Sequence, residues 1–403
     1  MSFFNMNDIK TIFCNFQFLR LWLAGTSSGI ARWLEVMCFS VFAWQISGDA
    51  TIAGFFMTLR FVGVMFSGIL FLFIGGRVSG QITMIFMHIL LSINCSFGLF
   101  ISLGSINTIV LFSLISFFSG MLWSADFSFR RRMLADRLEQ VFIAKGLAID
   151  VTSTHATRLI AMFIGGIIIS LEQPVILLFF LFALYCVPLI LFYFESDSLR
   201  SDTSIRIAFK SVFNQARKQK SIRLVLLLTP IYNIFVLPYL ALITLVFLER
   251  FRLEPHFAGY LSSLEGAGAL LGGILVSILQ PRKKELTFIC ALTGLLIAIF
   301  LMGSFPYVSG VIVILFLAGN MSAIYSSMQS TLIYINSETN LRSPTFSLMT
   351  VAIGIGLLGT SNIAWMGNFF SVSHILMVMA IEGLLALFVI FFLQWIFKKF
   401  IFN

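Results

Sequence analysis

Long apolar stretches recur along this chain, and they constrain its fold more than any other feature. A helix needs about 20 apolar residues to cross the ~30 Å hydrocarbon core of a membrane, and stretches of that length follow one another here. Hydrophobic residues are 59% of the 403 residues and charged residues 11%, whereas about a quarter of a soluble protein is charged. Residues 177–194 lack the polar and apolar alternation of a membrane β-barrel. The sequence therefore predicts an all-α membrane protein.

Twelve membrane spans are predicted, in two sets of six. Their limits lie where Gly, Pro, Asn or charged residues interrupt the apolar runs. A long polar segment separates the two sets, so we expect a six-helix bundle in 1–194, a cytoplasmic linker in 195–221 and a second bundle in 222–403. The predicted spans are 20–46, 51–76, 81–103, 106–128, 142–170 and 174–194, followed by 223–249, 256–279, 286–304, 308–334, 344–370 and 373–396.

Basic residues gather in the loops on one side of the predicted bundle. The formal net charge is +9, but the bases lie in short segments between spans, which argues against a nucleic-acid partner. The other side carries mainly Arg250 and Arg252. The positive-inside rule then places both termini in the cytoplasm. On the basic side lie Arg77, Arg130, Arg131, Arg132, Arg137, the bases of the linker, Arg282, Lys283, Lys284, Arg342, Lys398 and Lys399.

An internal repeat relates the two predicted bundles. Residues 53–70 align without gaps on residues 258–275, with seven of the eighteen positions identical, including two glycine pairs that follow Gly54 and Gly259. Arg77 falls on Arg282 at the same offset of 205 residues. The second span of each half is therefore the same element. Two parallel halves related about the membrane normal are typical of one class of secondary transporter, with the substrate site between the halves near mid-membrane.

Two stretches of the first half resemble a known family. They are 31–35 with Gly54 and Arg60, and 126–133 with Asp150 and the glycine pair 165–166. Both are similar to major facilitator exporters of the branch that contains enterobactin and multidrug effluxers. The chain departs from the family pattern at two places: the loop 75–81 lacks the usual Asp, and Ala161-Met162 stands where Gly-Pro is usual.

The resemblance implies a fold and a function. The fold is twelve helices in two bundles, in which the first, fourth, seventh and tenth spans line the cavity and the third, sixth, ninth and twelfth face lipid. The function is proton-coupled export, by antiport, of a small organic molecule such as a siderophore or an amphiphilic drug, by a monomer in the inner membrane of a bacterium. The alternatives are a nutrient importer of the same fold and a non-transporting membrane receptor or scaffold.

The sequence contains no motif for an enzyme or a cofactor. It has no phosphate-binding loop, no HExxH helix and no nucleophile elbow. The five cysteines fall singly within or beside apolar segments and are expected to be free thiols. We therefore expect no cofactor and no bound metal, and an ion gradient is the simplest source of energy.

Ionisable residues within membrane spans are costly, so each is a candidate for function. Arg32 and Glu35 lie three residues apart on one helical face and can pair. Glu35 is the first candidate for a proton carrier, because a carboxyl group in an apolar cavity beside an arginine can exchange a proton near neutral pH. The alternative is a permanent structural ion pair.

A polar stripe is predicted on the fifth span, where Asp150, Thr154 and Arg158 recur at a spacing of four with His155 beside them. The stripe either lines an aqueous path or forms a polar seam against the eighth span. Asp126 and Arg130, also four apart, are predicted to form a gate pair at the inner end of the fourth span.

Arg60 and Glu265 occupy equivalent positions in the repeat but carry opposite charges, which symmetric scaffolding would not require. The three arginines of the first, second and fifth spans favour an anionic or amphiphilic substrate over a lipophilic cation. The candidate residues are Glu35, Asp150 and Glu265 for proton coupling, Arg32, Trp33, Arg60, Thr154 and Arg158 for substrate binding, and Arg77, Asp126 and Arg130 for gating.

Overall fold

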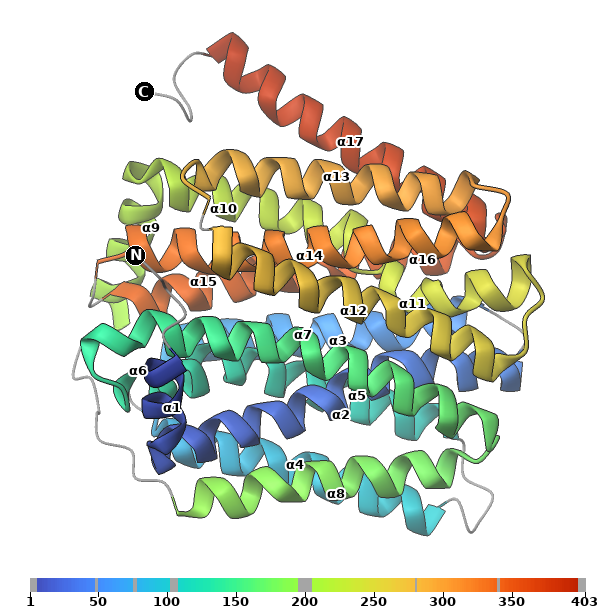
Figure 1. Cartoon of the computed structure of the whole chain (residues 1–403), viewed down its shortest axis with the longest axis horizontal. Helices are drawn as coiled ribbons and strands as arrows, with labels where there is room; N and C mark the ends of the chain where they lie inside the picture. The colour runs from blue at the N-terminus through green and yellow to red at the C-terminus, as the bar shows by residue number, and fades with distance from the viewer. Residues whose placement is uncertain are drawn as a thin grey trace.

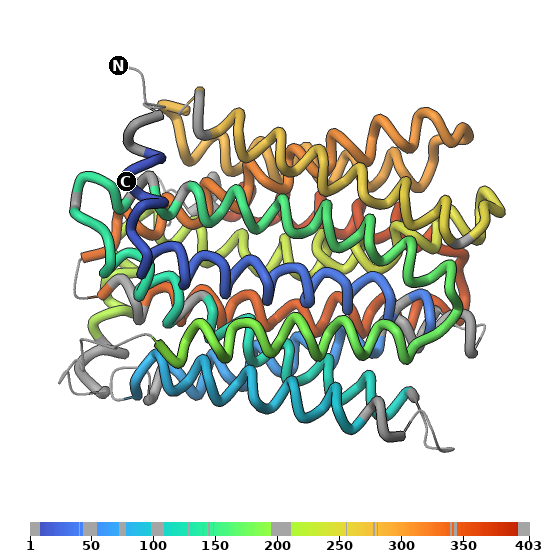
Figure 2. The backbone as a smooth tube through the Cα atoms, turned by 60° about the horizontal axis from the view of Figure 1, so that its bottom comes forward, coloured from blue at the N-terminus to red at the C-terminus, as the bar shows by residue number. Residues whose placement is uncertain are grey.

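The computed structural model describes a bundle of long helices that run side by side (Figures 1 and 2). Within the described part of the chain every regular element is a helix. The helices follow the order of the predicted spans, and the all-α prediction is confirmed. The structure describes residues 6–47, 50–74, 78–101, 108–194, 205–279, 281–338 and 341–397.

The first half consists of short and long helices in the order of the first six predicted spans. A short helix, α1, precedes them, and the fourth span ends in a π-helical turn, η1, and a short helix, α6. The elements are α1 (Met6–Cys14), α2 (Phe16–Ser47), α3 (Ala50–Ile74), α4 (Gly80–Ile101), α5 (Thr108–Ala125), η1 (Asp126–Arg130), α6 (Arg131–Asp136), α7 (Gln140–Ser170) and α8 (Pro174–Tyr193).

The second half has the same order of long helices, but two of its spans are interrupted. The seventh span contains Pro230 and Pro238, which lack the backbone N–H of a regular helix, and it is divided by two π-helical turns. The eleventh span is interrupted at Ile355 and Gly356. The elements are α10 (Lys220–Ile231), η2 (Tyr232–Val236), α11 (Tyr239–Leu245), η3 (Val246–Arg250), α12 (Pro255–Leu279), α13 (Lys284–Ser304), α14 (Val308–Asn336), α15 (Arg342–Gly354), α16 (Leu357–Met366) and α17 (Val372–Phe397).

The helices match the predicted spans in length and composition. Within the described ranges, 9 helices are long and apolar enough to cross a membrane, and shorter apolar helices cover Phe55–Phe71 and Ile109–Ala125. The long helix α2 corresponds to the remaining predicted span, the first. Large apolar side chains are exposed along α4 and α17, including Phe86, Phe97 and Phe388. These helices lie at the periphery, where the resemblance predicts contact with lipid (Figure 1).

The predicted linker contains one further helix, α9 (Ile205–Lys218), and its predicted end at 221 falls in the first turn of α10. α9 packs against α3, α10 and α15, and Thr345 donates a hydrogen bond to Gln215 at 3.2 Å. α1, α9 and the C-terminal end of α17 lie at the same end of the bundle (Figure 1). The cytoplasmic location of the termini and of the linker stays a prediction from the charge of the loops.

The internal repeat has a structural counterpart in how each second span packs. A Cβ atom at Gly63 of α3 would overlap the carbonyl group of Phe117 in α5. At the equivalent Gly268 of α12, a Cβ atom would overlap the carbonyl group of Phe316 in α14. Both crossings therefore need glycine for close backbone approach, so the repeated glycines carry the same packing function in both halves.

Two seams join the halves. In one, α7 packs along α12, where Gly166 and Gly259 approach closely and a Cβ atom at Gly266 would lie 2.6 Å from backbone atoms of Leu159. In the other, α3 packs against α15 and α16, and Thr58 hydrogen-bonds to Thr360 at 2.8 Å. The site described next lies between these seams.

Candidate functional site

Eight charged side chains are buried within the described part of the chain. They are four arginines and four carboxylates, all on α2, α3, η1, α7 or α12, so the buried interior is electrically balanced when every group is ionised. Uncompensated charge would be costly in this low-dielectric environment. The eight are Arg32, Arg60, Arg130, Arg158, Glu35, Asp126, Asp150 and Glu265.

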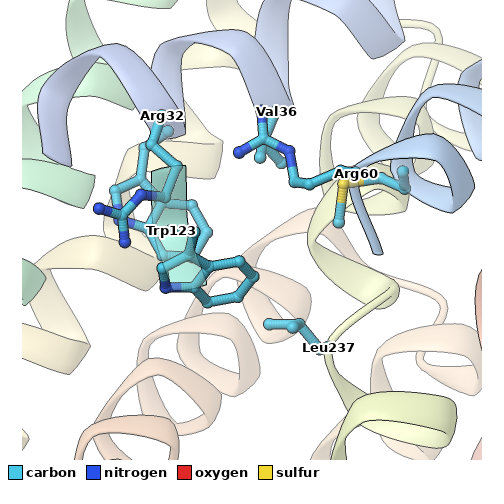
Figure 3. A pocket seen from close by; sticks show the side chains of 7 residues that line it. Arg32, Val36, Arg60, Trp123 and Leu237 are labelled. Carbon is cyan, nitrogen blue, oxygen red and sulfur yellow. The ribbon is translucent and has the colours of Figure 1, made fainter. Parts of the chain in front are cut away.

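A small cavity lies among the first of these charges. The empty space between its atoms is about 220 Å³ when the part open to the surroundings is included, and the room inside is about that of one water molecule. Arg32 and Arg60 lie on one side of the cavity, Leu237 of the second half lies on the other, and Trp123 lies between them (Figure 3). The lining residues are Arg32, Trp33, Val36, Met57, Arg60, Trp123 and Leu237.

Glu35 is held by residues of three other helices. Arg60 of α3 and Tyr185 of α8 both donate hydrogen bonds to its carboxylate, and Ser119 of α5 is a further hydrogen-bond partner. The predicted pairing of Glu35 with Arg32 is wrong. Helical spacing places Arg32 within reach of Glu35, but Arg60 reaches the carboxylate from the neighbouring helix α3. Arg32 points toward another acid, Asp126.

Arg32 faces Asp126 and the ring of Trp123. Its guanidinium lies 3.9 Å from the Asp126 carboxylate and 5.5 Å from the centre of the Trp123 ring. At 3.9 Å the ion pair is long, so the guanidinium is held loosely at the edge of the cavity.

A cluster at the C-terminal end of the fourth span joins it to α7. Arg130 donates hydrogen bonds to Asp126, four residues earlier, and to Asp150 of α7 at 2.7 and 3.2 Å. Arg131 reaches Asp150 from the other side at 3.2 Å. Gly25 of α2 has no side chain, and the Arg130 guanidinium occupies the space where its Cβ atom would lie. Asp126 and Arg130 are paired, and the pair is buried and extended by Asp150 and Arg131; its role in gating stays a prediction.

The polar stripe predicted on α7 is divided between two clusters. Asp150 belongs to the Arg130 cluster, and Thr154 donates its hydroxyl hydrogen to the Asp150 carbonyl at 3.0 Å. Arg158 pairs with Glu265 of α12 at 2.9 Å. The stripe therefore contributes to a polar seam against the eighth span, as one of the two sequence interpretations predicts. Arg77, predicted to act in gating, lies outside the described residues.

The Arg158–Glu265 pair crosses from one half to the other. Tyr239 of α11 donates a hydrogen bond to Glu265 at 3.1 Å, and Arg158 donates one to Nδ1 of His155 at 3.0 Å. The Arg158 guanidinium also lies over the ring of Trp33, 4.9 Å from its centre. Trp33 lines the cavity, so it joins the cavity to the ion pair between the halves.

Several buried polar atoms at the site have no hydrogen-bond partner among the described residues. At the cavity these are Nη1 of Arg60 and Nε1 of Trp33, and both are donors. At the seam they include Oε2 of Glu265 and Nε of Arg158. Buried polar groups are normally satisfied, so these atoms are the ones that a bound group or a change of conformation could satisfy.

The sequence of this chain matches one family over most of its length. The profile of the Major Facilitator Superfamily covers residues 21–361. The chain belongs to the major facilitator superfamily. As a major facilitator protein it is a multi-pass membrane transporter rather than an enzyme. A search among curated protein sequences gives no match.

Solved structures of other major facilitator proteins share the fold at low sequence identity. An auto-inhibited POT family peptide transporter has a TM-score of 0.71 at 11% identity, covering 92% of this chain and 95% of its own. A D-xylose–proton symporter has a TM-score of 0.66 at 14% identity, and the match covers 92% of this chain and 96% of the symporter. The human organic anion transporter MFSD10 has a TM-score of 0.65 at 14% identity, and the match covers 94% of this chain and 99% of MFSD10. At these identities the likeness establishes the fold, and it does not identify the substrate.

Three residues of this major facilitator site were not predicted from the sequence. Tyr185 and Tyr239 each donate a hydrogen bond to a buried carboxylate, and Trp123 lies beneath Arg32. Aromatic residues are 15% of the chain, so single ones carry no signal. His88, also unplaced by the sequence, hydrogen-bonds to Ser28 at 2.7 Å and to the Met84 carbonyl. It joins α4 to α2 without an acidic partner.

Proposed function

We propose that this major facilitator protein is a proton-coupled secondary transporter of a small organic anion, working as a monomer in the inner membrane of a bacterium. One observation carries the proposal. Among the described residues, the cavity between the halves is lined by two arginines, two tryptophans and no carboxylate, and the buried donors Nη1 of Arg60 and Nε1 of Trp33 have no partner. Such a lining suits an acceptor-rich anion and disfavours a cation.

Two carboxylates are the proposed proton-coupling residues at the centre of the molecule. Glu35 lies directly behind the Arg60 that lines the cavity, and Glu265 lies at the seam between the halves. Proton exchange at either one would break an arginine pair that this structure contains. Protonation can therefore change the balance between conformations. Asp150, the third predicted coupling residue, is paired with two arginines and is better suited to holding the gate cluster.

The direction of transport separates two candidate functions. The resemblance to exporters implies antiport of substrate against protons. Import together with protons is the alternative, and a D-xylose–proton symporter is among the structures that share the fold. A solved relative that carries organic anions supports the substrate class, although at 14% identity this support is weak.

Flux into liposomes under an imposed pH gradient tests the proposal. The purified protein would be reconstituted, and the movement of labelled siderophores, aromatic acids and amphiphilic drugs measured for wild type and Glu35→Gln. We expect gradient-driven flux of anionic compounds that Glu35→Gln uncouples from the gradient.

A matched control is available in the same measurement. Glu382 of α17 pairs with Asn362 at 3.0 Å, away from the cavity lining, so Glu382→Gln should leave the flux coupled. Flux that ignores the gradient would overturn the coupling proposal, and an absence of any flux would favour the receptor or scaffold alternative.

A further inference from the structure

Basic side chains are concentrated at one end of the second bundle. Along residues 211–223 and 281–290 of the described chain, seven side chains are basic and one, Glu285, is acidic. Ser221 of α10 donates a hydrogen bond to Glu285 of α13 at 2.5 Å, so the starts of these two helices lie side by side. The seven bases, called the basic cluster below, are Arg217, Lys218, Lys220, Arg223, Arg282, Lys283 and Lys284.

The linker helix α9 presents its part of the cluster on the outside of the bundle. Val212, Gln215 and Ala216 share one face of α9 and are buried, and the helix packs against α3, α10 and α15. Phe213 and Arg217 are exposed on the opposite face, and the Arg217 guanidinium lies 4.7 Å from the centre of the Phe213 ring. An exposed aromatic ring beside a cation is typical of the interface between a membrane and water.

The starts of α10 and α13 add further hydrogen-bond donors. Arg223 of α10 donates from Nη1 to the Arg217 carbonyl at 2.8 Å, and its buried Nε has no hydrogen-bond partner among the described residues. The N-cap residues Gln219 and Lys283 make no side-chain cap hydrogen bond, so the first backbone N–H groups of both helices point toward the cluster. Together with the bases, these groups favour an anion at this end of the bundle.

The first bundle has bases at the same end, but its own acids neutralise them. Arg130 and Arg131 both pair with Asp150, and Arg132 lies 4.0 Å from Asp136. In the basic cluster one carboxylate accompanies seven bases. The two ends therefore differ in how much positive charge they offer to a partner.

Apolar side chains are exposed directly after the bases along α10 and α13. Leu227 follows Arg223 by one turn of α10 and is exposed. α17 lies apart from α13 toward its own C-terminal end, so the start of α13 is uncovered (Figure 1). An exposed apolar stripe runs along one face of α13 and consists of Leu286, Cys290, Ile297 and Leu301. A ligand at this surface meets positive charge at one end and apolar side chains along its length.

We infer that the basic cluster binds the headgroup of an anionic phospholipid, whose acyl chains lie along α10 and α13. Phosphate oxygens accept charge-assisted hydrogen bonds from lysine and arginine, and basic clusters beside membrane helices suit anionic headgroups. The positive-inside rule accounts for an excess of bases on one side of the membrane. It does not require that they gather at three helix ends above an apolar stripe. The site goes beyond the proposed transport function and does not depend on the transported substrate.

Native mass spectrometry of the full-length protein in neutral detergent tests the inference. The probes are dioleoylphosphatidylglycerol, dioleoylphosphatidylcholine with the same acyl chains, and inorganic phosphate. We expect one phosphatidylglycerol molecule to bind about tenfold more tightly than phosphatidylcholine. Inorganic phosphate should not displace it, because phosphate has no acyl chains to contact the apolar stripe.

Matched variants locate the site. Lys218→Gln with Lys283→Gln removes one exposed base from each stretch, and we expect the affinity for phosphatidylglycerol to fall about fivefold for each base removed. Lys10→Gln with Arg132→Gln removes two bases at the same end of the first bundle and should bind as wild type does. Glu285→Gln removes the acid of the cluster, so it should bind phosphatidylglycerol more tightly.

The outcomes separate a lipid site from other roles of these bases. Equal binding of the two lipids, or equal loss of binding in the two double variants, would overturn the site and leave the bases a role in topology alone. Displacement of the lipid by inorganic phosphate would overturn the lipid as the ligand. Thermal unfolding without added lipid checks that each variant is folded, and the single variants Lys218→Gln and Lys283→Gln repeat the test if a double variant is not. Liposome flux is measured separately, so loss of this site would leave the proposed transport function in place.

Discussion

Arg158 and Glu265 form an ion pair that joins α7 of the first half to α12 of the second. Both side chains are buried, and each also has a polar atom without a partner among the described residues. Such a pair is costly to form, yet removing one member leaves the other as an isolated buried charge. The pair is thus better suited to holding two halves in one arrangement than to adding net stability.

Single and double variants of this pair should therefore differ. Glu265→Gln alone leaves Arg158 as a buried charge without its acid and should destabilise the protein by about 3–5 kcal/mol. Arg158→Gln together with Glu265→Gln should cost less than the single change, because no uncompensated charge remains. Thermal unfolding in detergent measures both, with Glu382→Gln as a control outside the pair. If the double variant lost as much stability as Glu265→Gln and Arg158→Gln lose together when each is made alone, the two residues would not interact.

The sequence predicted which residues matter more reliably than it predicted their partners. All eight buried charged residues stood out because ionisable groups in apolar spans are rare. Their pairing depends on how neighbouring helices rotate against one another. Helical spacing favoured Arg32 for Glu35, but packing brings Arg60 to it instead. For the same reason nothing in the sequence indicated Tyr185 or Tyr239.

At the scale of helices, glycine determines how closely the halves approach. Gly266 of α12 lies against the backbone of Leu159 in α7, with 2.6 Å from its ideal Cβ position to the Leu159 Cα and N atoms. Backbone cannot yield as a flexible side chain can. The seam between α7 and α12 therefore requires glycine at this position.

Alanine at Gly266 should force this seam apart. We expect Gly266→Ala to destabilise the protein by about 1–3 kcal/mol through overpacking and to reduce transport. Gly294→Ala in α13 is the matched control, since its Cβ would meet only the Met321 side chain, at 3.5 Å. It should be neutral or slightly stabilising, because alanine favours the helix. Equal melting temperatures for the two variants would contradict the packing argument.

The helices themselves were predictable, and their irregularities were not. Apolar runs between polar interruptions gave the limits of the spans, because the membrane requires each helix to satisfy its own backbone. The π-helical turns at 126–130, 232–236 and 246–250 depend on local packing and on the loss of donors at prolines. The first of these turns contains Asp126 and Arg130, which belong to the gate cluster.

At the scale of the whole molecule, the orientation in the membrane remains a prediction from charge. The loop between α12 and α13 carries Lys283, and the loop between α7 and α8 carries Gln173, both exposed. With both termini in the cytoplasm, these loops lie on opposite sides.

Cysteine labelling in whole cells tests this orientation. In a background with Cys14 and Cys290 replaced by serine, a membrane-impermeant maleimide should label Gln173→Cys in intact cells. It should label Lys283→Cys only after the cells are permeabilised. The reverse pattern would invert the topology, since the positive-inside rule is a tendency of insertion and not a property of the fold.

The seam between α3 and the helices α15 and α16 is packed at two levels. Along α3, Thr58 contacts Thr360 toward the Ala50 end, and a Cβ atom at Gly68, toward the Ile74 end, would lie 3.5 Å from the Thr350 methyl group. Movement of the halves against each other would part these contacts. Transport then requires the two ends to open in turn, with the halves moving largely as rigid bodies about the site.

Disulfides placed at either end should stop transport on their own. Thr58→Cys with Thr360→Cys would place two thiols where the hydroxyl groups now hydrogen-bond at 2.8 Å, and Gly68→Cys with Thr350→Cys would join α3 to α15 further along the seam. We expect oxidation to abolish liposome flux in both double variants and reduction to restore it, while each single cysteine variant stays active. Flux that continued with one end fastened would mean that the halves need not separate there. The substrate path would then run through one bundle rather than between the two.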